Sequence, residues 1–102
     1  MSRHTLQPVF YRQPNGKSAS EKVPREVVAR ACRRWDDAML RGGFNKAIID
    51  TRTRIGRTTE AAKLRGVLVM LSEKEMDYST DQRKVDEIER LYALAERRLS
   101  GL

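Results

Sequence analysis

Few side chains in this sequence could act as a nucleophile or a base, and their spacing does not bring them together. Covalent and acid–base catalysis need a nucleophile within hydrogen-bond reach of a base whose pKa lies near neutrality. The single cysteine, Cys32, is far along the chain from the single histidine, His4. Cys32 also falls on the apolar side of a predicted helix beside Trp35, where a thiol is usually a packing residue. We therefore expect no catalytic residues.

Carboxylates and glycines also lack the spacing that metal or phosphate sites require. Asp36 and Asp37 are neighbours on a predicted helix, so their side chains point about 100° apart and do not converge on one substrate. The acidic residues between positions 73 and 81 lack the glycine and the ligand spacing of an EF-hand loop. Gly42 and Gly43 are followed by Phe and Asn, not by the Lys and Ser/Thr of a phosphate-binding loop. The sequence predicts a protein without enzymatic activity, cofactor or metal.

Arginine and lysine are the residues that indicate a binding function. The formal net charge of the 102-residue chain is +7, and residues 1–66 hold fifteen Lys/Arg against six Asp/Glu. Residues 67–102 hold six against eight. A positive field speeds association with nucleic acid or with an acidic protein surface. We expect the partner to contact the first two-thirds of the chain.

The segment 54–73 supports a nucleic-acid hypothesis. Within it, residues 55–62, with the sequence IGRTTEAA, resemble the turn and the start of the second helix in helix-turn-helix DNA-binding regulators. This resemblance implies a transcriptional regulator that reads bases in the major groove and also contacts phosphates. The implied residues are Thr58, Thr59, Lys63 and Arg65 at the bases and Arg52, Arg54 and Arg57 at the phosphates.

The same segment favours protein binding for a different reason. At about 100° per residue, Lys63 and Arg65 project about 160° apart, so they do not converge on one surface. The other outward positions carry no charge, and they are Ala62, Gly66 and Val69. A helix that is apolar all round should be buried all round, so we expect its surplus apolar face to contact a partner or a second subunit. The predicted partner-binding residues are Arg30, Arg34, Arg41, Ala62, Val69 and Met70.

Helix-start and helix-stop residues in the sequence predict four helices, at about residues 21–41, 44–56, 58–74 and 80–99. These helices must position the candidate binding residues. Gly42 and Gly43 end the first helix. Thr58 is predicted to cap the third helix, and Ser79 or Thr80 to cap the fourth.

The spacing of apolar residues defines the fold class. The first predicted helix carries one apolar stripe, formed by Val28, Cys32, Trp35 and Met39, and its arginines gather on the opposite side. We therefore expect an all-α protein: a single domain over residues 21–102, built as a small bundle of three to four helices. The surplus apolar surface predicts a homodimer built on the third and fourth helices.

Residues 1–20 are predicted to form an extended basic arm. Pro8 interrupts the alternation of residues 5–12, which favours an edge strand or an extended segment. Phe10 and Tyr11, set among basic residues, could stack on a partner. A loosely ordered terminus is the simpler interpretation, given how terminal segments usually behave.

The longest apolar run and the first residues of the chain indicate the cellular location of the protein. The longest apolar run, residues 67–71, is too short to cross a bilayer, and the first residues lack the apolar region of a secretory signal. We therefore expect a cytoplasmic protein with no membrane partner.

The leading hypothesis is a small non-enzymatic regulator that binds an acidic or apolar protein surface, as adaptors or antiactivators of transcription factors do. The alternative is a helix-turn-helix-like DNA-binding regulator, and an RNA-associated role for the arm also stays open.

Overall fold

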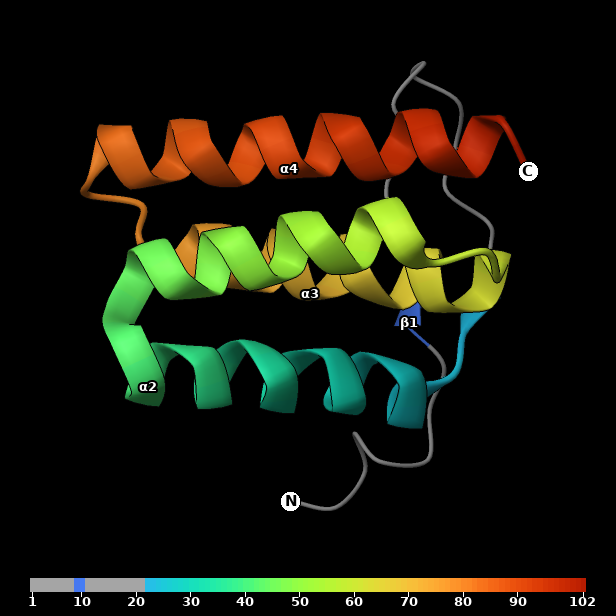
Figure 1. The fold of residues 1–102 in the computed structure, drawn as a ribbon, viewed down its shortest axis with the longest axis horizontal. Helices are drawn as coiled ribbons and strands as arrows, with labels where there is room; N and C mark the ends of the chain where they lie inside the picture. The colour runs from blue at the N-terminus through green and yellow to red at the C-terminus, as the bar shows by residue number, and fades with distance from the viewer. Residues whose placement is uncertain (1–8, 11–21) are drawn as a thin grey trace.

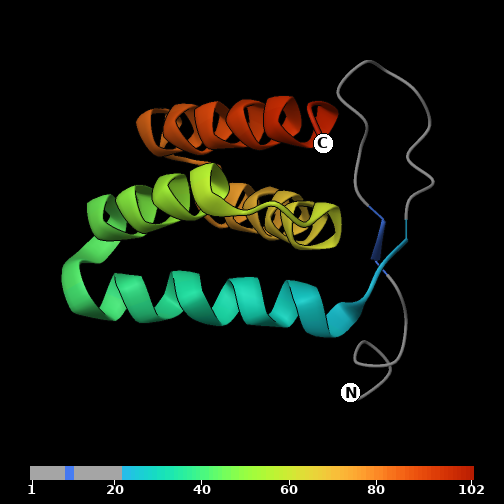
Figure 2. The same cartoon turned by 45° about the vertical axis from the view of Figure 1, so that its right-hand side comes forward.

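The computed structural model describes residues 9–10 and 22–102, and within them the chain is almost entirely helical. Helix α2 spans Arg25–Arg57, α3 spans Ala61–Asp77 and α4 spans Gln82–Ser100. Two short strands, β1 (Val9–Phe10) and β2 (Lys22–Val23), pair antiparallel ahead of α2. The two halves of α2 fold back along each other, and α3 and α4 complete a bundle of four helical segments (Figures 1 and 2). The predicted all-α fold class is confirmed.

Helix α2 consists of two helices joined at a sharp corner. Gly43 has φ 80° and ψ −164°, a backbone conformation that essentially only glycine adopts. The corner separates a first half, residues 25–42, from a second half, residues 44–57, which runs back in the opposite direction (Figure 1). The predicted break at Gly42 and Gly43 is therefore confirmed.

Aromatic packing holds this corner. The ring of Phe44 lies edge-on to Trp35 and to Tyr78, with ring centroids 5.9 Å and 5.2 Å apart. Lys84, from the start of α4, places its ammonium group 5.4 Å from the Phe44 ring centroid and 5.2 Å from that of Tyr78. These contacts join α2, α3 and α4 at one end of the bundle, and edge-on aromatic pairs contribute beyond simple burial.

Replacing Gly43 with alanine should destabilise the protein by about 1–3 kcal/mol, because an L side chain is strained at this φ and ψ. Gly56 is the matched control, since its φ is ordinary and, as at Gly43, no neighbouring atom of the described residues lies within 4 Å of an added Cβ. Gly56→Ala should be neutral or should stabilise by about 0.5–1 kcal/mol. Urea unfolding of both variants measures the difference. Equal stabilities would show that the corner does not depend on Gly43.

Helix α3 is the central helix of the bundle, packed against both α2 and α4. Its buried residues are Leu64, Gly66, Val67, Leu68, Val69, Met70 and Leu71. Val69 is 3% exposed and Met70 is 1% exposed. The prediction that these two residues form an exposed apolar surface is therefore wrong, because the chain itself covers a helix that is apolar all round.

Glycine allows α2 and α3 to approach closely. A Cβ at Gly66 would overlap the side chain of Val27 and would stand 3.3 Å from the Val27 carbonyl oxygen. Both groups belong to the first turn of α2, whose backbone has little freedom to move. Gly66 is thus a packing residue of the interface between the two helices.

Two predicted helix caps are wrong. Thr58 ends α2 instead of starting α3, because its N–H and its hydroxyl both donate to the Arg54 carbonyl oxygen, at 2.9 Å and 2.6 Å. Helix α3 begins only further along the chain. Asp81, and not Ser79 or Thr80, caps α4, since its carboxylate accepts a first-turn backbone N–H at 3.3 Å.

Most of the predicted arm, residues 1–20, lies outside the described residues. Val9–Phe10 is the described part, and it pairs antiparallel with Lys22–Val23, with Val9 opposite Val23. Val23 is fully buried and joins the core. Over residues 22–102, no helix combines the length and the apolar character needed to cross a membrane.

Candidate functional site

A groove lined by charged residues runs between the two halves of α2. One part holds about 440 Å³ and reaches the start of α3, and the other holds about 270 Å³ and reaches toward the Gly43 corner. The two parts share Arg34 and Asp50 and so form one surface, which we refer to as the basic groove. Its cations are Arg34, Arg41, Lys46, Arg54, Arg57 and Lys63, and its acids are Asp37, Asp50 and Glu60.

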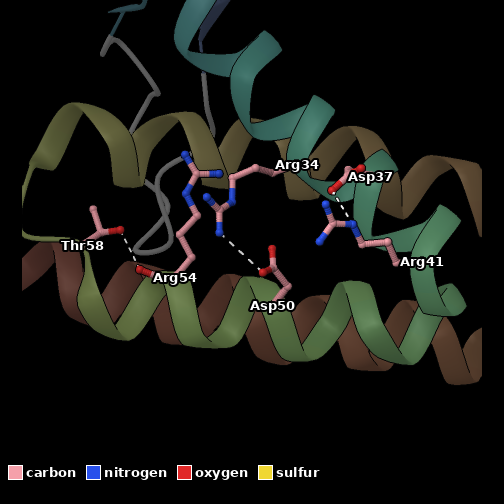
Figure 3. A network of polar contacts seen from close by, with 6 residues as sticks. All are labelled: Arg34, Asp37, Arg41, Asp50, Arg54 and Thr58. Carbon is pink, nitrogen blue, oxygen red and sulfur yellow. Dashed lines mark hydrogen bonds and ion pairs between the residues drawn. The ribbon is translucent and has the colours of Figure 1, made fainter.

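Ion pairs lie within the basic groove, and one of them crosses it (Figure 3). Arg34 Nη2 lies 3.5 Å from Asp50 Oδ1, which joins the two halves of α2. Arg41 Nε lies 3.1 Å from Asp37 Oδ2, one turn away on the same half. All four side chains keep contact with solvent, and such pairs contribute little to stability. Their charges are therefore available to a partner.

Arg54 faces the same groove without an ion pair. Its side chain is half-buried, and within the described residues its guanidinium group makes no hydrogen bond. Burial lowers the pKa of Arg54, neighbouring Arg34 lowers it further, Asp50 opposes this shift, and Arg30 adds to it. Several guanidinium groups thus share one carboxylate. An incoming anion would relieve their mutual repulsion.

Contacts from α4 hold the end of the groove in place. Arg98 donates from Nε to the Ile55 carbonyl oxygen at 3.3 Å and from Nη2 to the Thr58 carbonyl oxygen at 2.7 Å. A cation at a helix C-terminus satisfies free carbonyl groups and interacts favourably with the helix dipole. Sequence reasoning missed Arg98, because its contacts lie some forty positions away and no local pattern marks them.

The structure brings together residues that the sequence assigned to two competing sites. Arg34 and Arg41, predicted for a protein partner, line the basic groove, and Arg30 lies near enough to Arg54 to affect its pKa. Five residues of the nucleic-acid hypothesis line the same groove: Arg54, Arg57, Thr58, Thr59 and Lys63. Both hypotheses therefore point to one surface.

Other predicted site residues do not line the groove. Arg52 is exposed and Arg65 is half-buried, each on another part of the surface. Ala62 is exposed at the start of α3, whereas Val69 and Met70 are buried in the core. The apolar part of the predicted partner-binding surface is thus reduced to Ala62.

The geometry of α3 disfavours its use as a recognition helix. Such a helix lays one exposed face into the major groove of DNA. The middle of α3, from Gly66 to Leu71, is buried on every side. In both views, α3 runs in the opposite direction to the second half of α2 (Figures 1 and 2). The exposed early positions of α3 are Ala62 and Lys63.

Cys32 is half-buried and lies away from the basic groove. Its thiol donates to Glu73 Oε1 over 3.8 Å. Burial raises the pKa of Cys32, and the negative charge of Glu73 raises it further. The thiol is therefore held in its protonated, weakly nucleophilic form, as the predicted packing role requires.

Cys32 should react slowly with iodoacetamide at pH 8.5, and faster once the chain is unfolded in guanidinium chloride. Because folding raises the thiol pKa above its ordinary value of 9.0, the unfolded chain loses the proton first as the pH rises. The stabilisation from the protonated thiol is thus present below pH 9 and is lost above it. Mass spectrometry of the alkylated protein follows the reaction. Equal rates in the folded and unfolded chain would contradict this assignment.

Within residues 22–102, histidine, cysteine and carboxylate side chains form no group of three that could hold a metal ion. No protein-family model, curated protein or solved structure matches the chain. A functional proposal must therefore start from the basic groove itself.

Proposed function

We propose that this chain is a small, non-enzymatic, cytoplasmic regulatory protein that binds an acidic segment of a partner protein along the basic groove. Adaptors and antiactivators of transcription factors act in this way, by occupying a surface. The observation that carries the proposal is the groove itself, where cations outnumber acids and the half-buried Arg54 lacks an ion-pair partner within the described residues.

The charge pattern of the groove favours a protein over a nucleic acid. Three carboxylates are set among its cations, namely Asp37, Asp50 and Glu60. A nucleic acid carries phosphates at fixed spacing, so some of them would face these carboxylates and be repelled, whereas a flexible protein segment can place its carboxylates against the arginines and its neutral groups against the groove carboxylates. Arginine is also enriched in protein–protein interfaces, where its planar group pairs with carboxylates.

A pull-down from cytoplasmic extract, with and without nuclease, tests the proposal. Tagged protein should recover one stoichiometric protein that survives nuclease treatment, and its yield should fall as salt is raised, because the contact is electrostatic. Recovery that depends on nucleic acid, with one DNA sequence enriched, would support the DNA-binding alternative and contradict the proposal.

A homodimer is a separate proposal that the groove does not require. Of the residues that motivated it, Val69 and Met70 are buried, and large apolar side chains are instead exposed at Leu40, Ile49, Met76 and Leu102. A second subunit would be expected to cover Leu40, which at 88% is the most exposed of these four side chains. Light scattering should then give twice the chain mass of 11.8 kDa, and Leu40→Ser should restore the single-chain mass.

A further inference from the structure

Asp50 lies at the centre of the basic groove. It belongs to the second half of α2, one turn before Arg54, and it faces Arg34 on the first half (Figure 3). Its carboxylate is shared by both parts of the groove. Any ligand that follows the groove must pass this carboxylate.

The Arg34–Asp50 contact is weak for a charged pair. The N–O distance is 3.5 Å, whereas charge-assisted hydrogen bonds are usually about 2.7–2.9 Å long. The Arg34 side chain is 54% exposed and that of Asp50 is 30% exposed, so water screens the attraction. An incoming carboxylate could displace Asp50 at little cost.

One carboxylate is too few for the cations around it. Asp50 makes a single contact with Arg34, and Arg54 has no hydrogen bond to it. A carboxylate that is free to move can accept from two guanidinium groups, whereas Asp50 is fixed by its own helix. The site therefore has capacity for one more carboxylate, and the intramolecular contact already shows the chemistry it accepts.

We propose that Asp50 acts as an internal competitor that occupies Arg34 until a carboxylate of the partner replaces it. This inference rests on the proposed function, and it identifies the partner group as an aspartate or glutamate side chain held by Arg34 and Arg54 together. Every ligand that binds Arg34 must first break the Arg34–Asp50 contact. A segment with several acidic residues offsets this cost more readily than an isolated acidic residue, so the competition favours acidic segments.

Titration of a fluorescent hexaglutamate peptide at low salt tests the competition. Asp50→Asn removes the competing charge and keeps the shape of the side chain, so this variant should bind the peptide about three- to tenfold more tightly. Glu89→Gln is the matched control, because it removes one negative charge from an exposed position on α4. It should leave peptide affinity nearly unchanged. An equal gain in both variants would show an effect of net charge alone and overturn the inference.

A double-mutant cycle separates competition from local repulsion. If Asp50 acts by occupying Arg34, the gain from Asp50→Asn should disappear in an Arg34→Gln background. If Asp50 only repels the ligand through space, the gain persists without Arg34, and the inference is wrong. Circular dichroism of each variant verifies that the helices are intact.

The carboxylate site and the proposed function can fail separately. Absence of hexaglutamate binding to the wild type and to every variant would overturn the carboxylate site, even if a partner protein is recovered from nuclease-treated extract. Loss of the partner in that extract, with the Asp50→Asn gain intact, would contradict the proposed function and leave the carboxylate site supported.

Discussion

Replacing Val69 with aspartate should unfold the chain and not merely separate two subunits. Val69 is 3% exposed in the centre of α3, where an aspartate would have no partner and little water. Burying an unpaired charge is among the most destabilising single changes, and we expect a loss of about 4 kcal/mol or more. A domain of this size has only about 5–15 kcal/mol of stability. Thermal unfolding followed by circular dichroism should show a greatly lowered midpoint or no folded baseline.

Ala62→Asp is the matched control for this experiment. It introduces the same side chain into the same helix, but at an exposed position in the first turn. There a negative charge interacts favourably with the helix dipole. Its melting temperature should stay close to that of the wild type. A Val69→Asp variant that stays fully folded while losing a dimer would contradict this expectation and would indicate that α3 is a subunit interface.

Reversing two charges in the basic groove should abolish partner capture. In Arg34→Glu/Arg54→Glu, both cations assigned to the partner carboxylate become repulsive, and we expect a loss of affinity of about 100-fold or more. Capture is measured by quantitative mass spectrometry of pull-downs from nuclease-treated extract. Because Arg34 is exposed and Arg54 is half-buried without an ion pair in the described residues, the helices should stay folded.

A double variant on α4 controls for net charge. Arg83→Glu/Arg97→Glu changes the formal charge by the same amount at two exposed positions away from the groove. It should retain most of the captured partner. Equal losses in the two double variants would mean that the total charge of the protein, and not the groove, drives association.

Local sequence patterns predicted the helices well but their caps less well. The break at Gly42 and Gly43 could be predicted because two glycines end a periodic apolar stripe, and Gly43 indeed takes a positive φ. The cap at Thr58 could not, because a threonine hydroxyl can bond to a following N–H or to a preceding carbonyl group. Here the hydroxyl donates to the preceding Arg54 carbonyl group, and α2 ends at that point.

Burial of α3 was predicted in part. Its apolar residues on every side correctly indicated a helix covered on every side, since Val69 and Met70 are both buried. What covers them depends on how α2 folds back and how α4 packs, which is tertiary information. The sequence alone therefore could not tell a second subunit from the rest of the same chain.

The basic groove illustrates the same limit. The arginines of the first half of α2 were predicted to lie opposite its apolar stripe, and Arg34 and Arg54 do lie at the surface or near it. Whether Arg34 and Arg54 lie close together depends on the register in which the two halves pack, and the Gly43 corner sets that register. Two separate candidate sites in the sequence thus became one surface in the structure.

Arginine labelling of the captured complex tests the groove as the interface most directly. Protein recovered with its partner from nuclease-treated extract is treated with phenylglyoxal, and the modification of each arginine is compared with that of the free protein by mass spectrometry. Arg34, Arg54 and Arg57 should be protected in the complex, whereas Arg83 and Arg97 on α4 should react as they do in the free protein. Protection on α4, with unchanged labelling of the groove arginines, would contradict the account.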